Sequence, residues 1–269
     1  MKSRVKIYIY GILVLILMLG SVLIANKKEK SIQTNSNVAL SNAKIEWGIK
    51  RGDNHEQPDL GSKNIQLIEK YNGMAMGNKE SKNIYVTFDL GYEAEYTAKI
   101  LDVLKENNVP AAFFITAHYV NTASDLVQRM INDGHIIGNH TVNHKSMPSL
   151  SEKNLTDEMM NLHTAIYEKF GYEMKYMRPP KGEYSERDLS ICKNLGYTTV
   201  MWSFAYADWD EAKQPSQSEA IKKIIDNTHN GEIMLLHATS KTNMEVLDNV
   251  IKQIKNMGYE FKSLDEFVR

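Results

Sequence analysis

From residue 83 onward, apolar segments typical of strands alternate with segments whose apolar residues recur at helical spacing. The first strand pattern, 83–89, is rich in β-branched and aromatic residues and ends in an acid. The next segment, 95–107, has the helical spacing, and Pro110 follows it. The alternation continues, with strands expected at 111–115, 135–138, 176–178, 198–203, 231–236 and from 261, and helices at 124–133, 152–170, 186–194, 218–229 and 243–257.

This alternation predicts an α/β fold in which helices cover a parallel sheet. The sheet could be doubly wound or closed into a barrel, and the pattern alone leaves both open. Helix ends are marked by ordinary capping residues. Ser124 is expected to cap the helix that it begins, and Gly134 is expected to end it.

The N-terminus carries a long uncharged segment between basic residues. Ile7–Asn26 contains 20 uncharged residues, mostly apolar, and a helix of that length spans about 30 Å, enough to cross a bilayer. We therefore expect residues 1–30 to form a membrane anchor or a signal helix. An uncleaved anchor is favoured, because Leu23 fits poorly before a signal cleavage site.

Composition divides the rest of the chain. Residues 31–45 are rich in Ser, Asn, Gln and Thr and are expected to be a flexible polar linker. Residues 46–82 include a short helical pattern near 65–71 and are expected to pack on the main domain as an extension. Residues 83–269 are expected to form that domain.

Charge and cysteine content exclude several classes of protein. The formal net charge is −1, and the first 26 residues hold three bases and no acid, so the remainder is net −4. A nucleic-acid-binding protein would show an excess of basic residues, so no nucleic acid is expected as a partner. The single cysteine, Cys192, excludes a disulfide within the chain and a zinc site built from cysteines. Cys192 is expected to be a small buried apolar residue.

Candidate chemistry gathers where the predicted strands end. Ligands of α/β proteins bind at the carboxyl ends of parallel strands. Charged or imidazole side chains follow five of the predicted strands, a coincidence that indicates a functional site. They are Asp89, His140 with His144, Arg178, Asp208 with Trp209, and His237.

Two of these histidines are spaced for metal binding. His140 and His144 are four residues apart, and on a helical turn their imidazoles would point the same way and could share a cation. A pair of solvated histidines in a turn is the structural alternative. No Glu follows the first histidine, so a metalloprotease of the thermolysin type is not indicated.

The remaining candidates could work as charge pairs. Arg178 stands before two prolines and could pair with Asp89, although an ordinary structural ion pair would look the same. Asp208 could orient His237 as an acid, although a lone histidine after an apolar strand is more often structural.

Five ordered motifs resemble the polysaccharide deacetylase family (NodB homology, carbohydrate esterase family 4) over residues 83–265. The first motif, at 87–91, continues through Tyr92 and Glu93. This longer run resembles the δ-lactam-biosynthetic de-N-acetylase branch of spore-forming bacteria, and so does the region around Trp47-Gly48. The motifs are T-F-D-L-G at 87–91, H-T-V-N-H at 140–144, R-P-P-K-G at 178–182, Asp208-Trp209, and L-L-H at 235–237.

The resemblance implies a fold and a division of labour. The fold would be a distorted (β/α) barrel with fewer than eight repeats, preceded by the N-terminal transmembrane or signal helix. Asp89 would be the general base that activates water, and Arg178 would position it. His237 would protonate the leaving amine, and Asp208 would orient His237.

The resemblance also implies a metal and a substrate site. His140 and His144 would hold a divalent metal, usually zinc, that polarises the acetamide carbonyl and the water. The backbone N–H of Lys181 would help to hold the oxyanion. Trp209 and Leu235 would complete the substrate site.

One departure concerns the metal. The family's second aspartate is a metal ligand, and Leu90 stands at that position, with no oxygen to offer. The metal could be held weakly by two histidines and water, Asp89 could itself contact the metal, or the site could be metal-free and inactive. We favour weak zinc binding with activity retained, because the other motif residues are intact.

The resemblance implies a hydrolase that removes the N-acetyl group of N-acetylmuramic acid in peptide-stripped peptidoglycan. The freed amine would then close to the muramic δ-lactam of spore cortex. The enzyme would follow a muramoyl-alanine amidase, at the outer face of the cell membrane, in the cell wall or around the forespore. Deacetylation of another glycan (peptidoglycan N-acetylglucosamine, chitin oligomers or xylan) and a non-catalytic, membrane-anchored glycan-binding relative remain as alternatives.

Overall fold

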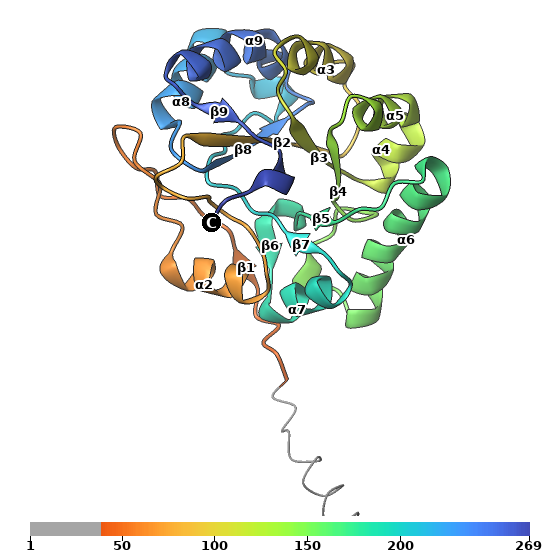
Figure 1. Ribbon diagram of the computed structural model, residues 1–269. Coiled ribbons are helices and arrows are strands. Elements are labelled where there is room, and N and C mark those ends of the chain that lie inside the picture. Colours follow the sequence, from red (N-terminus) through yellow and green to blue (C-terminus); the bar gives the residue numbers. More distant parts are fainter. Residues whose placement is uncertain (1–38) are drawn as a thin grey trace, which may run out of the picture. The chain divides into compact units, whose positions relative to one another are not determined.

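A row of six parallel strands lies at the centre of the structure, a computed structural model that describes residues 39–269 (Figure 1). A short strand, β9 (Glu260–Phe261), pairs with the start of β2. The row runs in the order β7 (Thr198–Thr199), β5 (Tyr176–Met177), β4 (Ile136–Asn139), β3 (Ala111–Ile115), β2 (Asn83–Leu90) and β8 (Glu232–His237).

Helices cover the outer side of this sheet (Figure 1), except the first of them, which packs within the N-terminal extension. They are α2 (Ser62–Lys70), α3 (Thr97–Glu106), α4 (Ala117–Thr122), α5 (Ser124–Asn132), α6 (Glu152–Phe170), α7 (Glu186–Asn194), α8 (Gln217–Asn227) and α9 (Lys241–Asn256), and the short 3-10 turns are η1 (Met147–Ser149), η2 (Pro180–Gly182), η3 (Glu211–Lys213) and η4 (Leu264–Glu266). The predicted α/β class with a parallel sheet is thus confirmed.

The sheet curls into a half-barrel. An isolated parallel bridge between Phe204 and Met234 brings the segment after β7 beside β8. The carboxyl ends of strands far apart in the row therefore face one another across the hollow of the curl.

Alternation along β2 divides the apolar core into two layers. Phe88 and Leu90 belong to the large cluster between the sheet and its helices, and Tyr85 belongs to the smaller cluster on the inner side. Successive side chains of a strand point to opposite faces, so Asp89 faces inward and its neighbour Leu90 faces the helices.

Several predicted helix boundaries are confirmed. Helices α6 and α7 have the predicted bounds. Ser151 caps α6, and Gly171 ends it in the left-handed conformation. Ser185 and Asp188 form a capping box at the start of α7.

Other predicted boundaries were wrong. Helix α4, which Thr116 caps, was not predicted. Because α4 ends at Thr122, the residue between the two helices is Ala123, and Ser124 is the first residue of α5 and caps nothing. Strand β7 stops at Thr199, where the chain leaves β5 and pairs with Met74 of the extension instead.

The N-terminal extension packs on the barrel. Strand β1 (Ile45–Glu46) pairs antiparallel with β6 (Glu183–Tyr184), directly after the R-P-P-K-G motif. Residues 41–45, expected within the linker, also contact this domain. The Ser41 carbonyl accepts from the Arg187 N–H at 3.0 Å, and Asn42 Nδ2 donates to the Pro148 carbonyl at 3.0 Å.

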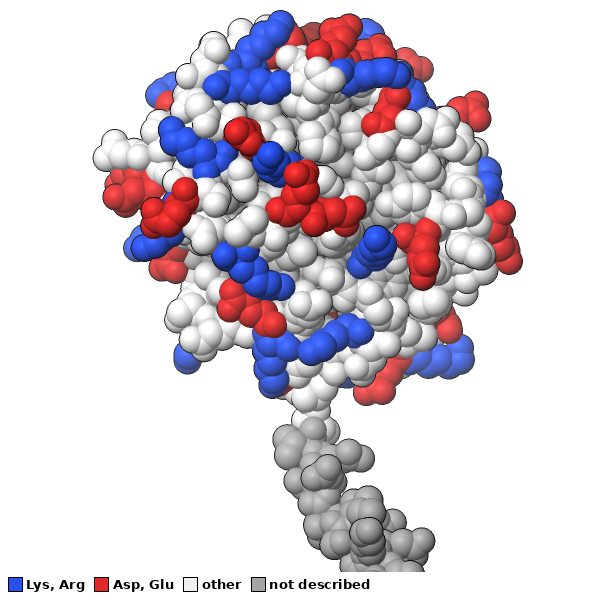
Figure 2. Space-filling model, in the orientation of Figure 1, with Lys and Arg blue, Asp and Glu red and all other residues white. Residues whose placement is uncertain are grey.

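The predicted anchor or signal, residues 1–30, lies outside the described residues. Within residues 39–269 no helix is both long and apolar enough to cross a membrane. On the face seen in Figure 2, acidic and basic side chains are interspersed rather than gathered by sign. Cys192 is buried, as predicted.

Candidate active site

Asp89 and Arg178 form a buried ion pair at the carboxyl ends of β2 and β5. Arg178 Nη1 donates to Asp89 Oδ1 at 2.8 Å, and both side chains are buried. Arg178 Nε donates to the Val200 carbonyl at 3.0 Å, and its guanidinium stacks over Phe114. Burial opposes the charge of Asp89, but the positive charge of Arg178 outweighs burial and lowers the pKa of Asp89.

His140 presents one ring nitrogen to the same carboxylate. Its Nδ1 lies 2.9 Å from the Arg178 carbonyl, which can only accept, so Nδ1 carries the proton. Its Nε2 is then an acceptor and lies 3.5 Å from Asp89 Oδ2. Burial lowers the pKa of His140 to about 4. His140 is therefore a neutral imidazole at neutral pH, the form that binds metals.

His144 meets His140 through a strained loop, not through the helical turn that the sequence analysis assumed. The ring centroids are 4.8 Å apart. Thr141 and His144 both have positive φ, at 66° and 54°, a conformation that residues other than glycine rarely adopt. Glu158 of α6 holds the loop, because its carboxylate accepts from the Asn143 backbone N–H at 2.7 Å.

His237 ends β8 and is held by Asp208. Its Nδ1 donates to Asp208 Oδ1 at 2.7 Å, and its backbone N–H donates to Asp208 Oδ2 at 2.8 Å. Asp208 is fully buried. Burial alone would lower the pKa of His237, but the hydrogen bond and charge of Asp208 outweigh it and raise that pKa.

Asn243 also belongs to the site and was not predicted from the sequence. Its Nδ2, on the first turn of α9, donates to Asp208 Oδ2 at 2.5 Å. Asn243 is buried and completes the hydrogen bonding of the Asp208 carboxylate. An asparagine near a helix start is ordinary, so no sequence signal distinguished it.

Most of the predicted residues line one open groove. Its volume is about 1030 Å³, at the upper end of the roughly 300–1,000 Å³ of small-molecule pockets. Arg178 and Asp208 lie behind its wall. The predicted residues that line it are Asp89, His140, His144, Lys181, Trp209, Leu235 and His237.

Lys181, Trp209 and Leu235 differ in how they line the groove. Trp209 is 57% exposed and meets the His237 ring edge-on at 5.8 Å. Leu235 is buried in its wall. Lys181 is exposed and has a left-handed backbone, with φ 60°.

The residues supply two ligands for a metal but not a third. The two imidazoles meet edge-on. The hydrogen bond from His140 Nδ1 to the Arg178 carbonyl leaves His140 Nε2 without a proton, so it can bind a cation. Leu90 packs among the apolar residues under the helices. Within residues 39–269, no three His, Cys, Asp or Glu side chains are grouped so that they could hold an ion. The pair fits a weakly held cation, short of the three protein ligands of catalytic zinc sites.

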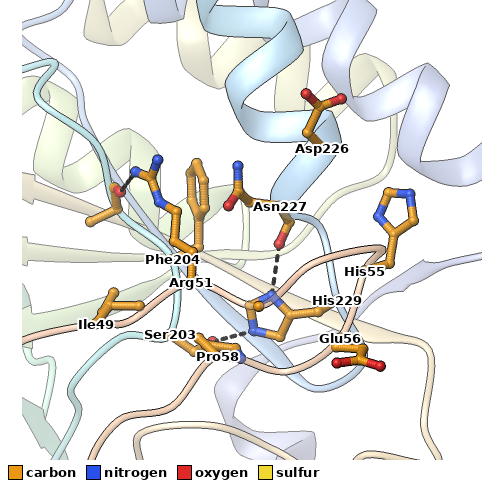
Figure 3. A pocket seen from close by; sticks show the side chains of 12 residues that line it. Ile49, Arg51, His55, Glu56, Pro58, Ser203, Phe204, Asp226, Asn227 and His229 are labelled. Atoms are coloured by element: carbon orange, nitrogen blue, oxygen red, sulfur yellow. Dashed lines mark hydrogen bonds between the residues drawn. The ribbon is translucent and has the colours of Figure 1, made fainter.

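A second, smaller pocket lies between the extension and the segment before β8 (Figure 3). Its wall contains a Ser–His pair, with His229 Nε2 2.8 Å from Ser203 Oγ. His229 Nδ1 faces the Asn227 carbonyl at 2.8 Å. Both Ser203 and His229 are 2% exposed, and Ser203 Oγ also accepts from the Ile233 N–H. The pair is therefore saturated and closed to a substrate, and we assign it a structural role.

Comparison with known proteins places this site in a family. A model described as polysaccharide deacetylase matches residues 76–200. The chain is 42% identical to the peptidoglycan-N-acetylmuramic acid deacetylase PdaA of Bacillus subtilis, over 86% of this chain and 88% of that protein. It is 31% identical to a peptidoglycan-N-acetylglucosamine deacetylase of Bacillus cereus, over 73% of this chain and 72% of that protein. The solved structure of Bacillus subtilis PdaA, a family 4 carbohydrate esterase, matches with a TM-score of 0.82 at 42% identity, covering 85% of this chain and 98% of that one.

Proposed function

The chain belongs to the polysaccharide deacetylase family, and we propose that it removes the N-acetyl group from N-acetylmuramic acid in peptidoglycan. The observation that carries the proposal is the pairing of a base and an acid across one groove. Asp89 and His237 are register partners on adjacent strands, and each is held by its own buried partner. The 42% identity to a deacetylase of N-acetylmuramic acid supports this substrate.

In the proposed mechanism Asp89 is the general base. Arg178 occupies Oδ1, which leaves Oδ2 to take a proton from the attacking water. The lowered pKa keeps the carboxylate ionised at neutral pH. The backbone N–H of Lys181 stabilises the oxyanion that forms on the acetamide oxygen when water attacks the carbonyl carbon.

His237 is the proposed general acid. Because Asp208 holds Nδ1, the imidazolium can donate only from Nε2, which then protonates the amine nitrogen as the C–N bond breaks. The raised pKa keeps this proton available near neutral pH. The products are acetate and a free amino sugar. Trp209 and Leu235 contact the sugar beside the acid.

Deacetylases of this family are metal-dependent, and we propose that His140 and His144 hold zinc here. A zinc ion held there would polarise the acetamide carbonyl and the water. The binding is weak, because Leu90 contributes no ligand and faces the helices.

The biological setting extends the same proposal. The substrate is glycan from which an amidase has already removed the peptide, and the freed amine closes to muramic δ-lactam in spore cortex. Residues 1–30 anchor the protein to the membrane or direct its export, residues 31 to about 40 act as a tether, and the catalytic domain acts outside the cytoplasmic membrane. The 20 uncharged residues Ile7–Asn26 support this placement.

Acetate release tests the activity. The protein is incubated with peptide-stripped glycan, with zinc and with chelator, and Asp89→Asn serves as the inactive control. In vivo, cortex from a strain without the protein should lack muramic δ-lactam, and normal lactam content would refute the proposed role.

Deacetylation of N-acetylglucosamine is the second candidate, favoured by the 31% identity to an enzyme with that name. Acetate released faster from N-acetylglucosamine oligomers than from muramic glycan would select it. Wild-type protein that binds glycan but releases acetate from neither substrate, with binding unchanged in Asp89→Asn, would select the non-catalytic glycan-binding alternative.

A further inference from the structure

Lys181 is an unpaired cation at the groove. It is the one Lys or Arg among the described residues that line the groove. Within residues 39–269, no carboxylate lies within 4.0 Å of its ammonium group, and the nearby Glu183 is paired with Lys44 at 3.2 Å. An exposed ammonium beside a substrate groove is available to an anionic group of a ligand.

The backbone at Lys181 is unusual for a residue with a side chain. Its φ of 60° lies in the left-handed region, between Pro180 and Gly182. A glycine would adopt this conformation without strain, so a lysine there indicates that the side chain has a use.

The loop that carries Lys181 is braced from behind. The backbone N–H of Trp47 donates to the Gly182 carbonyl at 2.9 Å, and its indole Nε1 donates to the Trp202 carbonyl at 2.9 Å. A Cβ added at Gly182 would meet the Trp202 ring at 2.8 Å and Trp47 at 3.0 Å. The extension therefore leaves the Lys181 loop little room to move, and the side chain projects from a fixed base.

The proposed substrate has an anion where this cation could bind it. In muramic acid the acetamide and the lactyl ether sit on adjacent ring carbons, close enough for the freed amine to close onto the lactyl carboxyl. In the proposed mechanism the acetamide lies between Asp89 and His237, and its oxygen is held by the backbone N–H of Lys181, which lines the same groove. The lactyl group then lies within the neighbourhood of the Lys181 side chain.

We propose that the Lys181 ammonium group binds the free lactyl carboxylate of the muramic acid residue and so selects glycan from which the peptide has been removed. This inference rests on the proposed function. When the stem peptide is attached, the lactyl carboxyl is a neutral amide and offers no charge to Lys181. N-acetylglucosamine has no lactyl group at all. The same contact thus discriminates against both alternatives.

The test uses two forms of one glycan. Peptide-stripped glycan carries the free carboxylate, and a matched sample has its carboxylates converted to methylamides. Acetate release by the full-length protein in detergent gives kcat/KM for each form. We expect wild type to prefer the carboxylate roughly ten- to a hundred-fold, the usual worth of a hydrogen bond to a charged group, and to lose part of this preference at high salt.

Variants assign the preference to the side chain. Lys181→Met should bring the ratio of the two kcat/KM values close to one, chiefly through a higher KM for the carboxylate form. Lys181→Arg should keep most of the ratio. Lys145→Met is the matched control, because Lys145 is an exposed lysine beside His144 that does not line the groove. His118→Gln tests the exposed histidine that does line the groove.

Three outcomes would overturn the proposal: equal activity of wild type on both forms, an unchanged ratio in Lys181→Met, or transfer of the effect to His118→Gln. If wild type releases acetate from neither form, the proposed function fails separately. Equilibrium binding of the two glycan forms to wild type and Lys181→Met, by calorimetry, then decides the inference in the same way. Circular dichroism confirms that each variant is folded.

Discussion

Asp89 and His237 are direct partners in the parallel register of β2 and β8. One pair of neighbouring strands therefore delivers both the proposed base and the proposed acid to the same edge of the sheet. Each side chain is held by a different buried partner. Arg178, directly after β5, donates to Asp89, and Asp208 accepts from His237. The two groups keep opposite charge states because their partners have opposite charges.

Replacing Asp89 with Asn should lower kcat for acetate release about 10³-fold, within the usual range for a general acid or base. The amide cannot take a proton from water, and it leaves the Arg178 guanidinium buried without a counter-charge. Acetate release and chemical denaturation measure the two effects separately. Asp102→Asn is the control, because Asp102 is an exposed partner of Arg129. Activity near the wild-type level would exclude Asp89 as the base.

Replacing Asp208 with Asn should move the alkaline limb of the pH–rate profile to lower pH. Asp208 raises the pKa of His237, and activity requires the protonated imidazole, so it falls as pH rises through that pKa. The amide of the Asp208→Asn variant keeps the shape of the carboxylate and loses its charge. Asp226→Asn, at an exposed acid paired with Lys222, should leave the profile unchanged. An unmoved limb in Asp208→Asn would separate His237 from the acid role.

The same pair should make stability depend on pH. The folded pKa of His237 is raised above its ordinary value of about 6.5. The stabilisation of the fold by protonated His237 is therefore fully present below that ordinary pKa, and it is lost as pH rises through the folded pKa. Denaturant titrations of wild type should show this loss, and Asp208→Asn should reduce it. If the free energy of unfolding depended equally on pH in wild type and Asp208→Asn, the pH dependence would not come from the His237–Asp208 pair.

Replacing Leu90 with Asp should destabilise the fold rather than complete a metal site. Leu90 is fully buried among apolar residues under the helices. An unpaired buried carboxylate costs about 3 kcal/mol or more, and part of the loss should be recovered at acid pH, where the carboxyl is protonated. Leu90→Met, which keeps the volume, is the control. A stable Leu90→Asp protein with tighter zinc binding would show that the end of β2 can turn this side chain inward.

Removing either imidazole should abolish measurable zinc binding. His140 and His144 are the proposed ligands, and a site with two protein ligands has none to spare. Equilibrium dialysis of His140→Ala and His144→Ala measures this without turnover. His118→Ala controls for a histidine that lines the groove but lies outside the pair. Zinc retained by both variants would place the metal elsewhere.

Replacing Trp47 with Phe should lower the free energy of unfolding by about 1 kcal/mol, the usual net worth of one hydrogen bond. The bond lost runs from the indole N–H to the Trp202 carbonyl. Because Trp202 also stacks near Arg178, at 5.6 Å, kcat should fall together with stability. Denaturation and acetate release on the same preparation test this, and Tyr167→Phe, at an exposed position on α6, is the control.

Local patterns predicted the helix ends well where a cap and a stop residue frame one helix. The bounds 152–170 were predicted for α6 and are confirmed, and the structure shows Ser151 and Gly171 at its two ends. The prediction failed at Ser124, because α4 ends directly before it and the sequence does not show that two helices meet there. Strand β7 was predicted too long because its partner after Thr199 is Met74, about 125 positions away in the chain.

The sequence by itself determined which residues are candidates for the chemistry and at which edge of the sheet they lie. Asp89, His140, His144, Arg178, Asp208 and His237 each follow an apolar strand, and parallel strands end at one edge. Only the tertiary structure decided which of them meet. The register that joins Asp89 to His237, the loop that turns His144 toward His140 and the inward face that excludes Leu90 all depend on contacts between distant segments. The alternation of residues along a strand specifies the face of the sheet on which each side chain lies, but not which strand is adjacent. Strand pairing is therefore decided only when the whole sheet is packed.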